Sequence, residues 1–362
     1  MKKLIPALTL AFLFSVSVNA QDVKIEPNEI IAQSQDVLAV KYSPDGNMLA
    51  VALWDKSVVV YSIDTTTGYQ VMHTLNKHTM QITGMAFSRD NKLLATVADD
   101  KMVVVWDTET GEIKHTFSGH TDKITGVEID PSLRFVITTS LDQTVRFWDM
   151  KPPPTKDPKK TTNRIQKLSY PATALTVDVT GRMIYVAGNN NIEQLSVVGK
   201  VMKTFEGHTN TITGLARSID KKHLASMSAD RSIIIWDITT GKQKFVLKGH
   251  SWDINSIEFT LDSKYLVSGG KDGKVILWDV ATGAQVTTFQ KEGTKVVNGA
   301  SVRADNATIA AATMLSGSPQ YGIVLWNSGV ERILPTRPTP AKGPKAPGQR
   351  PAPKSGKPAG KK

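Results

Sequence analysis

The chain has 362 residues, 40% of them hydrophobic, no cysteine and a formal net charge of +11. The absence of cysteine excludes disulfides, thiolate metal sites, a cysteine nucleophile and a lipidated N-terminal cysteine. The basic charge is concentrated, because residues 335–362 hold eight basic residues and no acidic one, Lys2 and Lys3 add two more, and residues 21–334 carry only +1.

Residues 1–20 are typical of a signal peptide. Lys2 and Lys3 form a positive start, Leu4–Val18 is largely apolar, and Val18-Asn19-Ala20 has the small-residue spacing of a cleavage site. A membrane anchor is disfavoured, because about 18 or more apolar residues are expected for one and Pro6 and several hydroxyl residues interrupt this run. We therefore expect export with cleavage, to the periplasm or beyond the cell, as a soluble protein.

A unit of about 42 residues repeats along the chain and is clearest in Lys77–Phe117. Its segments ITGMAF, KLLATV, MVVVWD and EIKHTF are rich in β-branched and apolar residues, and turn-forming residues separate them. We therefore predict four antiparallel strands in each unit. A single unit would leave its apolar faces in water, so the units are expected to stack and to fold only together.

Four positions of the unit form a fixed frame, in which a histidine is followed by Ser or Thr, Asp and Trp at offsets of 18, 22 and 28 residues. The complete frame occurs four times, as His78, Thr96, Asp100 and Trp106; His120, Thr138, Asp142 and Trp148; His208, Ser226, Asp230 and Trp236; and His250, Ser268, Asp272 and Trp278. Each tryptophan precedes an aspartate, and three of the histidines follow a glycine. This pattern resembles the WD40 repeat, of which each copy forms one four-stranded propeller blade.

The resemblance implies what the frame does. The aspartate is expected in the turn between the second and third strands, where it accepts a hydrogen bond from the histidine. The histidine contacts the Ser or Thr hydroxyl, which reaches the tryptophan N–H. Each such bond gives a partner to a polar group whose isolation would cost roughly 1–3 kcal/mol. We interpret these sixteen residues as structural tetrads.

The other copies depart from the frame. The first has Val51 and Tyr61 at the Ser/Thr and Trp positions, so packing is expected to hold it, and its Ser43–Gly46 segment (SPDG) predicts a turn. The fourth, roughly residues 165–206, has Asn189–Asn191 in the aspartate region, where asparagine tolerates left-handed turn geometry. The seventh inserts about five residues, within LSGSPQY, before Trp326. The count predicts an all-β, seven-bladed propeller of four-stranded antiparallel blades over residues 21–334.

Two segments compete to complete the last blade. Residues 24–32 (KIEPNEIIA) align without a gap onto the fourth strand of the unit and place Gln33 at the histidine position. Members of the family close their ring with an N-terminal strand, so this register favours the same arrangement here. Residues 330–334 (VERIL) are the alternative, since they follow the third strand of the seventh copy.

Two segments read as irregular. KPPPTKDPKKTTNR, after Trp148-Asp149, predicts an exposed loop between the third and fourth strands of its blade, because its prolines prevent strand formation. Residues 335–362 contain eight prolines, four glycines and no large apolar residue, which predicts a disordered basic tail. The tail is either a solvated spacer or a set of weak, salt-sensitive contacts to anionic envelope polymer or lipid. No aromatic residue interleaves with its lysines, which disfavours nucleic acid as a partner.

The recurring His, Ser/Thr and Asp residues suggest a catalytic triad at first, but a triad needs a single site with an exposed nucleophile. The four-fold repetition with tryptophan favours the structural interpretation. The seven histidines are dispersed without metal-ligand spacing, and no phosphate-binding glycine motif occurs. We therefore predict no catalytic residue, no metal site and no cofactor.

The top rim of the propeller is the remaining candidate surface. In the family, positions just after each histidine and just before each turn aspartate bind partners, and the resemblance assigns these positions to Asp36, Trp54, Gln81, Asp99, Lys123, Leu141, Trp252, Asp253 and Lys271. Trp54 and Trp252 lie outside the frame. Each is either an anchor for a partner or a residue that packs on a neighbouring blade.

The sequence favours an exported, monomeric, non-enzymatic scaffold that binds a protein or peptide on its top rim. The alternative is a propeller enzyme or a binder of small, sugar-type ligands that uses the central channel. The fold does not decide between these functions, because propellers host many.

Overall fold

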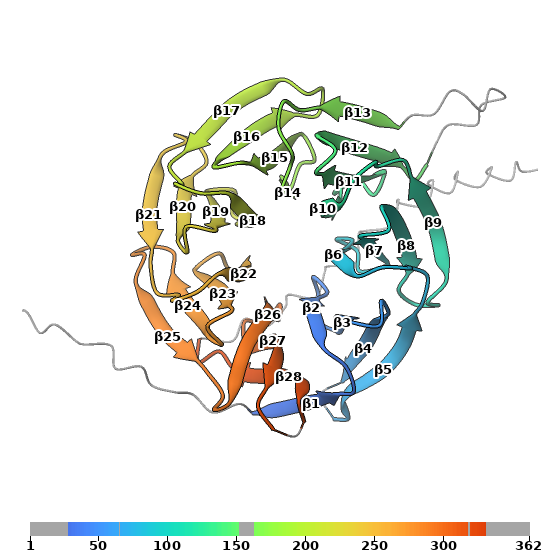
Figure 1. Cartoon of the computed structure of the whole chain (residues 1–362), viewed down its shortest axis with the longest axis vertical. Coiled ribbons are helices and arrows are strands. Elements are labelled where there is room, and N and C mark those ends of the chain that lie inside the picture. Colours follow the sequence, from blue (N-terminus) through green and yellow to red (C-terminus); the bar gives the residue numbers. More distant parts are fainter. Residues whose placement is uncertain (1–27, 65, 152–162, 318, 331–362) are drawn as a thin grey trace, which may run out of the picture.

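The computed structural model describes residues 28–64, 66–151, 163–317 and 319–330. In these ranges the strands form seven four-stranded sheets, in which every pair of neighbouring strands is antiparallel. The sheets are arranged as the blades of a ring around a central channel (Figure 1). The predicted seven-bladed propeller is confirmed. The signal peptide of residues 1–20, the proline-rich loop and the tail of residues 335–362 lie outside the described residues.

The blades are numbered 1 to 7 in chain order, and each blade contributes one strand to each of four concentric layers (Figure 1). The first, innermost strands are β2 (Val37–Tyr42), β6 (Ile82–Phe87), β10 (Ile124–Ile129), β14 (Ala174–Val177), β18 (Ile212–Arg217), β22 (Ile254–Phe259) and β26 (Thr294–Val302). The second strands are β3 (Met48–Leu53), β7 (Leu93–Ala98), β11 (Phe135–Ser140), β15 (Met183–Gly188), β19 (His223–Ser228), β23 (Tyr265–Gly270) and β27 (Thr308–Leu315).

The third strands are β4 (Val58–Asp64), β8 (Met102–Asp107), β12 (Thr144–Asp149), β16 (Asn191–Ser196), β20 (Ile233–Asp237), β24 (Val275–Asp279) and β28 (Tyr321–Asn327). The outermost strands are β5 (Gly68–Leu75), β9 (Ile113–Ser118), β13 (Arg164–Lys167), β17 (Val201–Glu206), β21 (Gln243–Leu247), β25 (Gln285–Phe289) and β1 (Glu29–Gln33).

The N-terminal strand closes the ring. β1 pairs with β28 in antiparallel register from Glu29 opposite Leu325 to Gln33 opposite Tyr321, and so becomes the outer strand of blade 7. This confirms the choice of the N-terminal segment, although the observed strand starts at Glu29 and residues 24–27 are not described. Closure in this way removes the free edge that β28 would otherwise expose.

The predicted start of the fourth copy is wrong. β13 (Arg164–Lys167) pairs with β12 as the outer strand of blade 3, and blade 4 begins only at Ala174. We assigned residues 165–167 to blade 4 and Arg164 to the loop before it. The insertion between Trp148 and Arg164 causes the error, because it moves the outer strand of blade 3 along the chain to where the next copy was expected. The insertion does connect a third to a fourth strand, as predicted.

The hydrophobic core lies between neighbouring blades. In β8, Val103 and Val105 pack toward Ile124 and Trp148 of blade 3, whereas Val104 and Trp106 pack toward blade 1. Alternate side chains of one strand thus face two different neighbours, and both faces are covered. This explains why the middle strands are continuous apolar runs and the outer strands are half-exposed.

The turns follow the expected chemistry. Gly46 donates its N–H to Ser43 at 2.8 Å and has a φ of +73°, which confirms the turn predicted for Ser43–Gly46. Asn189 has a φ of 52°, so asparagine does accommodate a left-handed turn in blade 4.

The described residues include no helix whose length and hydrophobicity would suit a bilayer crossing.

Candidate functional site

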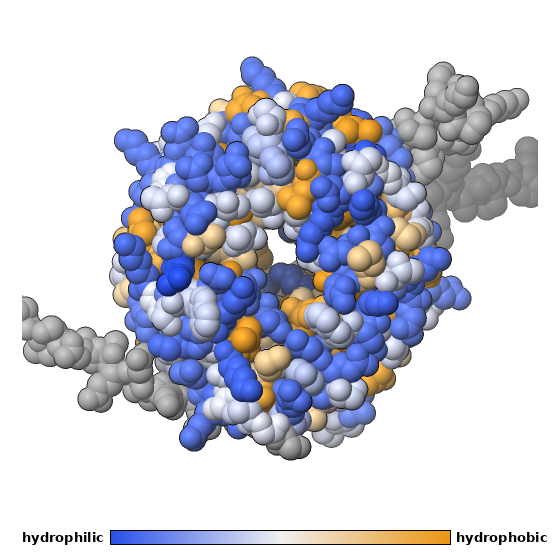
Figure 2. All heavy atoms as spheres, viewed as in Figure 1, coloured by the Kyte–Doolittle hydropathy of each residue, from blue (hydrophilic) through white to orange (hydrophobic). Residues whose placement is uncertain are grey.

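The strand directions define two faces of the ring. The top face carries the turns between second and third strands and the links that join one blade to the next. The bottom face carries the turns between first and second strands and between third and fourth strands. Viewed along its shortest axis, the ring has an opening at its centre, and the face on view is mainly hydrophilic with scattered apolar residues (Figure 2).

In blade 2 the four frame residues are joined in one hydrogen-bonded chain. His78 lies in the link before β6, Thr96 in β7, Asp100 in the turn after it and Trp106 in β8. His78 Nδ1 lies 3.0 Å from Asp100 Oδ2, and His78 Nε2 lies 2.8 Å from Thr96 Oγ1. Trp106 Nε1 donates to the same hydroxyl at 2.9 Å. The link, both middle strands and their turn are therefore tied together.

The same geometry recurs in blades 3, 5 and 6. His120, His208 and His250 place Nδ1 at 2.7, 2.8 and 3.0 Å from the aspartates Asp142, Asp230 and Asp272. Their Nε2 atoms lie 2.7, 2.8 and 2.8 Å from Thr138, Ser226 and Ser268, and Trp148, Trp236 and Trp278 donate to these hydroxyls at 2.9, 2.8 and 2.8 Å. The sequence spacing thus brings together all sixteen tetrad residues, four in each of four blades.

The direction of the bonds follows from donor supply. The tryptophan N–H must donate to the hydroxyl, and the carboxylate accepts from Nδ1, so wherever the imidazole is neutral the hydroxyl donates to Nε2. Although burial alone would raise it, hydrogen bonds from Ser232 and His208 lower the pKa of Asp230 to about 2. Burial lowers the pKa of His120, against the attraction of Asp142. Asp142, Asp230 and Asp272, whose pKa values are all lowered, are therefore anionic, and His120 is neutral at neutral pH.

The tetrad hydroxyls are not available to a substrate. Thr96, Thr138, Ser226 and Ser268 are each 0% exposed, and each hydroxyl is already bonded to both a histidine and a tryptophan. A nucleophile must reach its substrate, so these groups cannot act as one. Among the described residues, no three His, Cys, Asp or Glu side chains gather closely enough to hold a metal ion.

Eight of the nine rim residues predicted from the sequence occur as pairs on the top face. In each pair the residue before the first strand accepts a backbone hydrogen bond from the residue after the second strand, at 2.8–3.0 Å. The pairs are Asp36 with Trp54, Gln81 with Asp99, Lys123 with Leu141, and Asp253 with Lys271. The ninth, Trp252, lies next to Asp253 in the link that follows His250.

The two rim tryptophans are largely uncovered. Trp54 is 56% exposed in the β3–β4 turn, and Trp252 is 58% exposed in the β21–β22 link. Neither therefore packs on a neighbouring blade in the way that the frame tryptophans do. They belong to blades 1 and 6, so blade 7 lies between them on the ring (Figure 1).

Charged rim residues pair both within and between blades. Lys271 contacts Asp253 at 2.9 Å within blade 6, and Lys123 of blade 3 contacts Asp99 of blade 2 at 3.1 Å. Asn298 of blade 7 donates to Asp36 of blade 1 at 3.3 Å. Burial raises the pKa of Asp36, partly offset by a hydrogen bond from the Val37 backbone. The rim thus has fixed polar positions around two exposed aromatic side chains.

Sequence reasoning missed a charged group in the channel, made by Lys41, Glu128 and Glu258. Each is the fifth residue of an innermost strand, in VLAVKY, ITGVEI and INSIEF. The corresponding residue of blades 2 and 5 is alanine, Ala86 and Ala216. A comparison of the fifth residue of the innermost strand among the repeats could have revealed this group, because that residue is charged in three blades and alanine in two others.

The chain is similar to known families over several blades. The WD domain, G-beta repeat model matches residues 199–237 and 241–279, and the anaphase-promoting complex subunit 4 WD40 domain model matches residues 40–130. The first two matches end at Trp236-Asp237 and Trp278-Asp279, the third-strand ends of two blades with complete tetrads.

Curated relatives match over parts of their length. Target of rapamycin complex subunit wat1 of Schizosaccharomyces pombe is 30% identical over 215 residues, which cover 57% of this chain and 65% of that protein. Protein HIRA of Dictyostelium discoideum is 32% identical over 85 residues, 21% of this chain and 8% of that protein. COMPASS component SWD3 of Saccharomyces cerevisiae is 33% identical over 72 residues, 20% of this chain and 22% of that protein. With its repeats, its blades and these matches in agreement, the chain belongs to the WD40-repeat family of β-propeller proteins.

Proposed function

We propose that this protein is an exported, non-enzymatic scaffold that binds a protein or peptide partner on the top face of its propeller. The observation that carries the proposal is the pair of tryptophans, Trp54 and Trp252, each more than half exposed on that face. Large aromatic side chains lose little conformational freedom on binding and are enriched among residues that dominate interface energies.

The surroundings of the tryptophans suit such an interface. The carboxylates and ammonium groups of Asp253 and Lys271 lie at the edge of the same surface, where a partner would exchange their hydrogen bonds for new ones. One relative is named as a subunit of the target of rapamycin complex and another as a component of COMPASS, which agrees with a scaffold role. The fully buried tetrad hydroxyls support a structural rather than a catalytic purpose.

Export and the basic tail belong to the same proposal. The leader-like residues 1–20 would direct the chain out of the cytoplasm, and residues 335–362 would associate with anionic envelope polymer or lipid. In this scheme the propeller selects the partner and the tail sets where the protein stays.

The test compares two double variants. Partners are captured from envelope extract with the wild-type chain and identified, and each purified partner is then titrated against Trp54→Ala with Trp252→Ala and against Val71→Ala with Val286→Ala. Val71 and Val286 are 61% and 46% exposed but lie on outer strands. We expect the rim variant to bind at least about tenfold more weakly and the outer-strand variant to bind normally. Equal affinity of the rim variant would contradict the proposal.

A further inference from the structure

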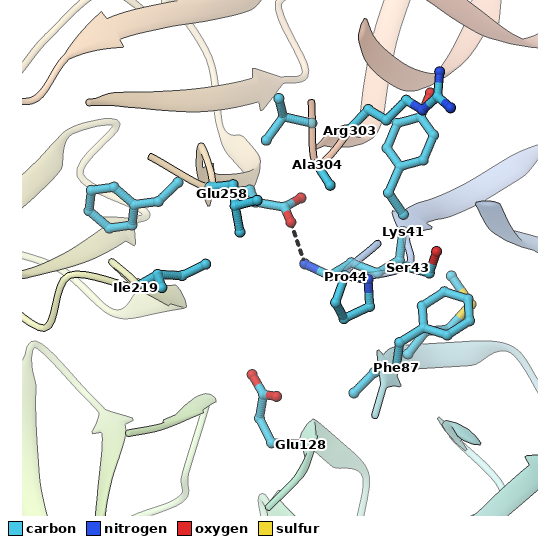
Figure 3. A pocket seen from close by; sticks show the side chains of 15 residues that line it. Lys41, Ser43, Pro44, Phe87, Glu128, Ile219, Glu258, Arg303 and Ala304 are labelled. Atoms are coloured by element: carbon cyan, nitrogen blue, oxygen red, sulfur yellow. Dashed lines mark hydrogen bonds and ion pairs between the residues drawn. The ribbon is translucent and has the colours of Figure 1, made fainter. Parts of the chain in front are cut away.

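A cavity of about 300 Å³ opens at the bottom end of the central channel. It is lined where the innermost strands end and the turns after them begin, in six of the seven blades, so no single blade forms it (Figure 3). Because the innermost strands run from the top face to the bottom face, this cavity lies at the opposite end of the channel from Trp54 and Trp252. Figure 3 shows Lys41, Glu128 and Glu258 reaching into it from different sides.

Lys41 and Glu258 form an ion pair across the channel. Lys41 Nζ of blade 1 lies 2.8 Å from Glu258 Oε1 of blade 6, and blade 7 lies between these blades on the ring. Burial would lower the pKa of Lys41, but the attraction of Glu258 and of Glu128 raises it overall. The ammonium group is therefore charged and its nearest partner is already fixed.

Glu128 of blade 3 faces this pair from the other side of the cavity (Figure 3). Within the described residues its carboxylate has neither a hydrogen bond nor an ion pair, whereas Glu258 has both with Lys41. Burial raises the pKa of Glu128 to about 7, against the attraction of Lys41 and Arg217 and with the repulsion of Glu258. A cationic ligand beside Glu128 would therefore supply the ion-pair partner that this carboxylate lacks among the described residues.

The remaining wall of the cavity is largely apolar. Phe87 of blade 2 and Phe259 of blade 6 line it, together with Ile219 and Leu261, which are 48% and 36% exposed at its mouth. Exposed apolar side chains beside an unpaired carboxylate suit a ligand with a charged head and a short hydrocarbon body. A wholly polar ligand would leave this wall wet.

We propose that the bottom cavity binds a small primary amine, whose ammonium group contacts Glu128 and whose hydrocarbon chain lies against the apolar wall. An ammonium has three donors, enough for both oxygens of Glu128 and a further acceptor. An organic anion is the wrong class, because it would meet two carboxylates, a lysine that is already paired with Glu258, and Arg303, which already contacts Asp305 and the Gly46 carbonyl. The site is separate from the top face, so it does not depend on the partner proposed above.

The proton on Glu128 gives this site a measurable signature. An ammonium binds best to the carboxylate form, while the amine itself, with a pKa of about 10, stays charged at neutral pH. Given the pKa of Glu128 of about 7, affinity should rise by about tenfold from about pH 6 to about pH 8. Binding near pH 7 should also release protons.

The experiment is calorimetric titration of the full chain with hexylammonium chloride, alongside sodium hexanoate and hexanol, in two buffers of different ionisation enthalpy. We expect hexylammonium to bind with the stated pH dependence and proton release, and the other two probes to bind at least about tenfold more weakly. Hexanoate binding as tightly as hexylammonium, a flat pH profile, or no heat with any probe would overturn the proposal.

Two variants locate the site. Glu128→Gln should lose at least about tenfold in affinity and all of the pH dependence, whereas Glu109→Gln, in the exposed β8–β9 turn, should behave as wild type. Unchanged binding by Glu128→Gln would refute the assignment. The Trp54→Ala, Trp252→Ala chain should retain amine binding, so failure of one proposal is distinguishable from failure of the other. If Glu128→Gln does not fold, the probe selectivity and pH profile of the wild type still decide.

Discussion

The side-chain amide of Gln33 donates a 2.9 Å hydrogen bond to the hydroxyl of Tyr61. Gln33 ends the strand that closes the ring, and Tyr61 lies in the third strand of blade 1. These residues occupy the histidine and tryptophan positions of the frame, and Val51 occupies the position of the hydroxyl between them. We expected packing alone to hold this blade; the structure adds one direct bond in place of the three-bond chain, at the joint where the ring closes.

That bond should contribute measurably to stability. Tyr61→Phe removes the acceptor and leaves the partly buried Gln33 amide without it, which should lower the free energy of unfolding by about 1 kcal/mol. Urea denaturation of Tyr61→Phe, Gln33→Ala and the double variant forms a double-mutant cycle. A coupling energy indistinguishable from zero would show that the pair is incidental.

Ring closure by the N-terminal strand predicts a contrast between the two ends of the chain. Starting the chain after Gln33 removes β1 from blade 7 and exposes the edge of β28, so we expect a large fall in melting temperature and increased aggregation. Deletion of residues 335–362 should leave melting unchanged while abolishing low-salt retention on anionic polymer.

Calorimetric scans and retention assays of the two truncations check both parts. A large fall in melting temperature on removal of residues 335–362 would show that the folded domain extends beyond residue 334. Unchanged melting on removal of β1 would contradict closure by the N-terminal strand.

The tetrads should act on stability rather than on activity. Ser226→Ala leaves the Trp236 N–H and His208 without their common partner in a fully buried site, so we expect a loss of roughly 1–3 kcal/mol. Ser251→Ala, on the exposed link of the next blade, should change stability little. Equal effects of the two substitutions in denaturant unfolding would argue against the structural role.

The tetrad aspartates predict an acid-sensitive fold. Because the folded-state pKa of Asp230 is depressed to about 2, the unfolded chain binds more protons as the pH falls below about 4. Its contribution is therefore complete above about pH 5 and is lost as the pH falls toward about 2. Unfolding measured against pH should show a shallower decline for Asp230→Asn than for the wild type; parallel curves would exclude Asp230 as a contributor.

Gly46 offers a test of contact between the first and last blades. Its φ of +73° disfavours any side chain, and a Cβ there would lie 3.0 Å from Arg303 Cγ of blade 7. Gly68 has nearly the same φ, +72°, but nothing within 4 Å. Gly68→Ala should therefore cost about 1 kcal/mol and Gly46→Ala distinctly more. Equal losses of unfolding free energy in Gly46→Ala and Gly68→Ala would show that Arg303 of blade 7 moves aside without measurable cost.

Much of the fold was predictable because a propeller repeats its constraints. A tetrad needs four residue types at fixed spacing. The histidine, Ser or Thr, aspartate and tryptophan of each copy therefore predict both the order of the strands and the position of the turn between the second and third strands. The gapless alignment of the segment before Gln33 likewise identified the closing strand. The insertion before Arg164 interrupts the regular spacing, and there the predicted boundary between blades 3 and 4 was misplaced. The outer strand that follows has only four residues, too few for its alternation of apolar and polar side chains to identify it.

The channel site was not predictable in the same way. Glu128, Lys41 and Glu258 are far apart in the sequence, and only comparison of the fifth residue of each innermost strand among the copies could have indicated that the ring brings them to one cavity. The regular spacing of the repeats identifies residues that the blades have in common, such as the tetrads. The site in the channel is instead formed by residues at a position where the blades differ from one another. The exposure of Trp54 and Trp252 required the structure for the same reason, since either could have packed on a neighbouring blade.

Hydrogen–deuterium exchange of the complex with a purified partner tests the central claim, recognition on the top face, most directly. The account predicts added protection in the β3–β4 turn around Trp54 and in the β21–β22 link around Trp252, with the outer strands β5 and β25 unchanged. Protection confined to the outer strands, with both tryptophan segments exchanging as in the free protein, would contradict it.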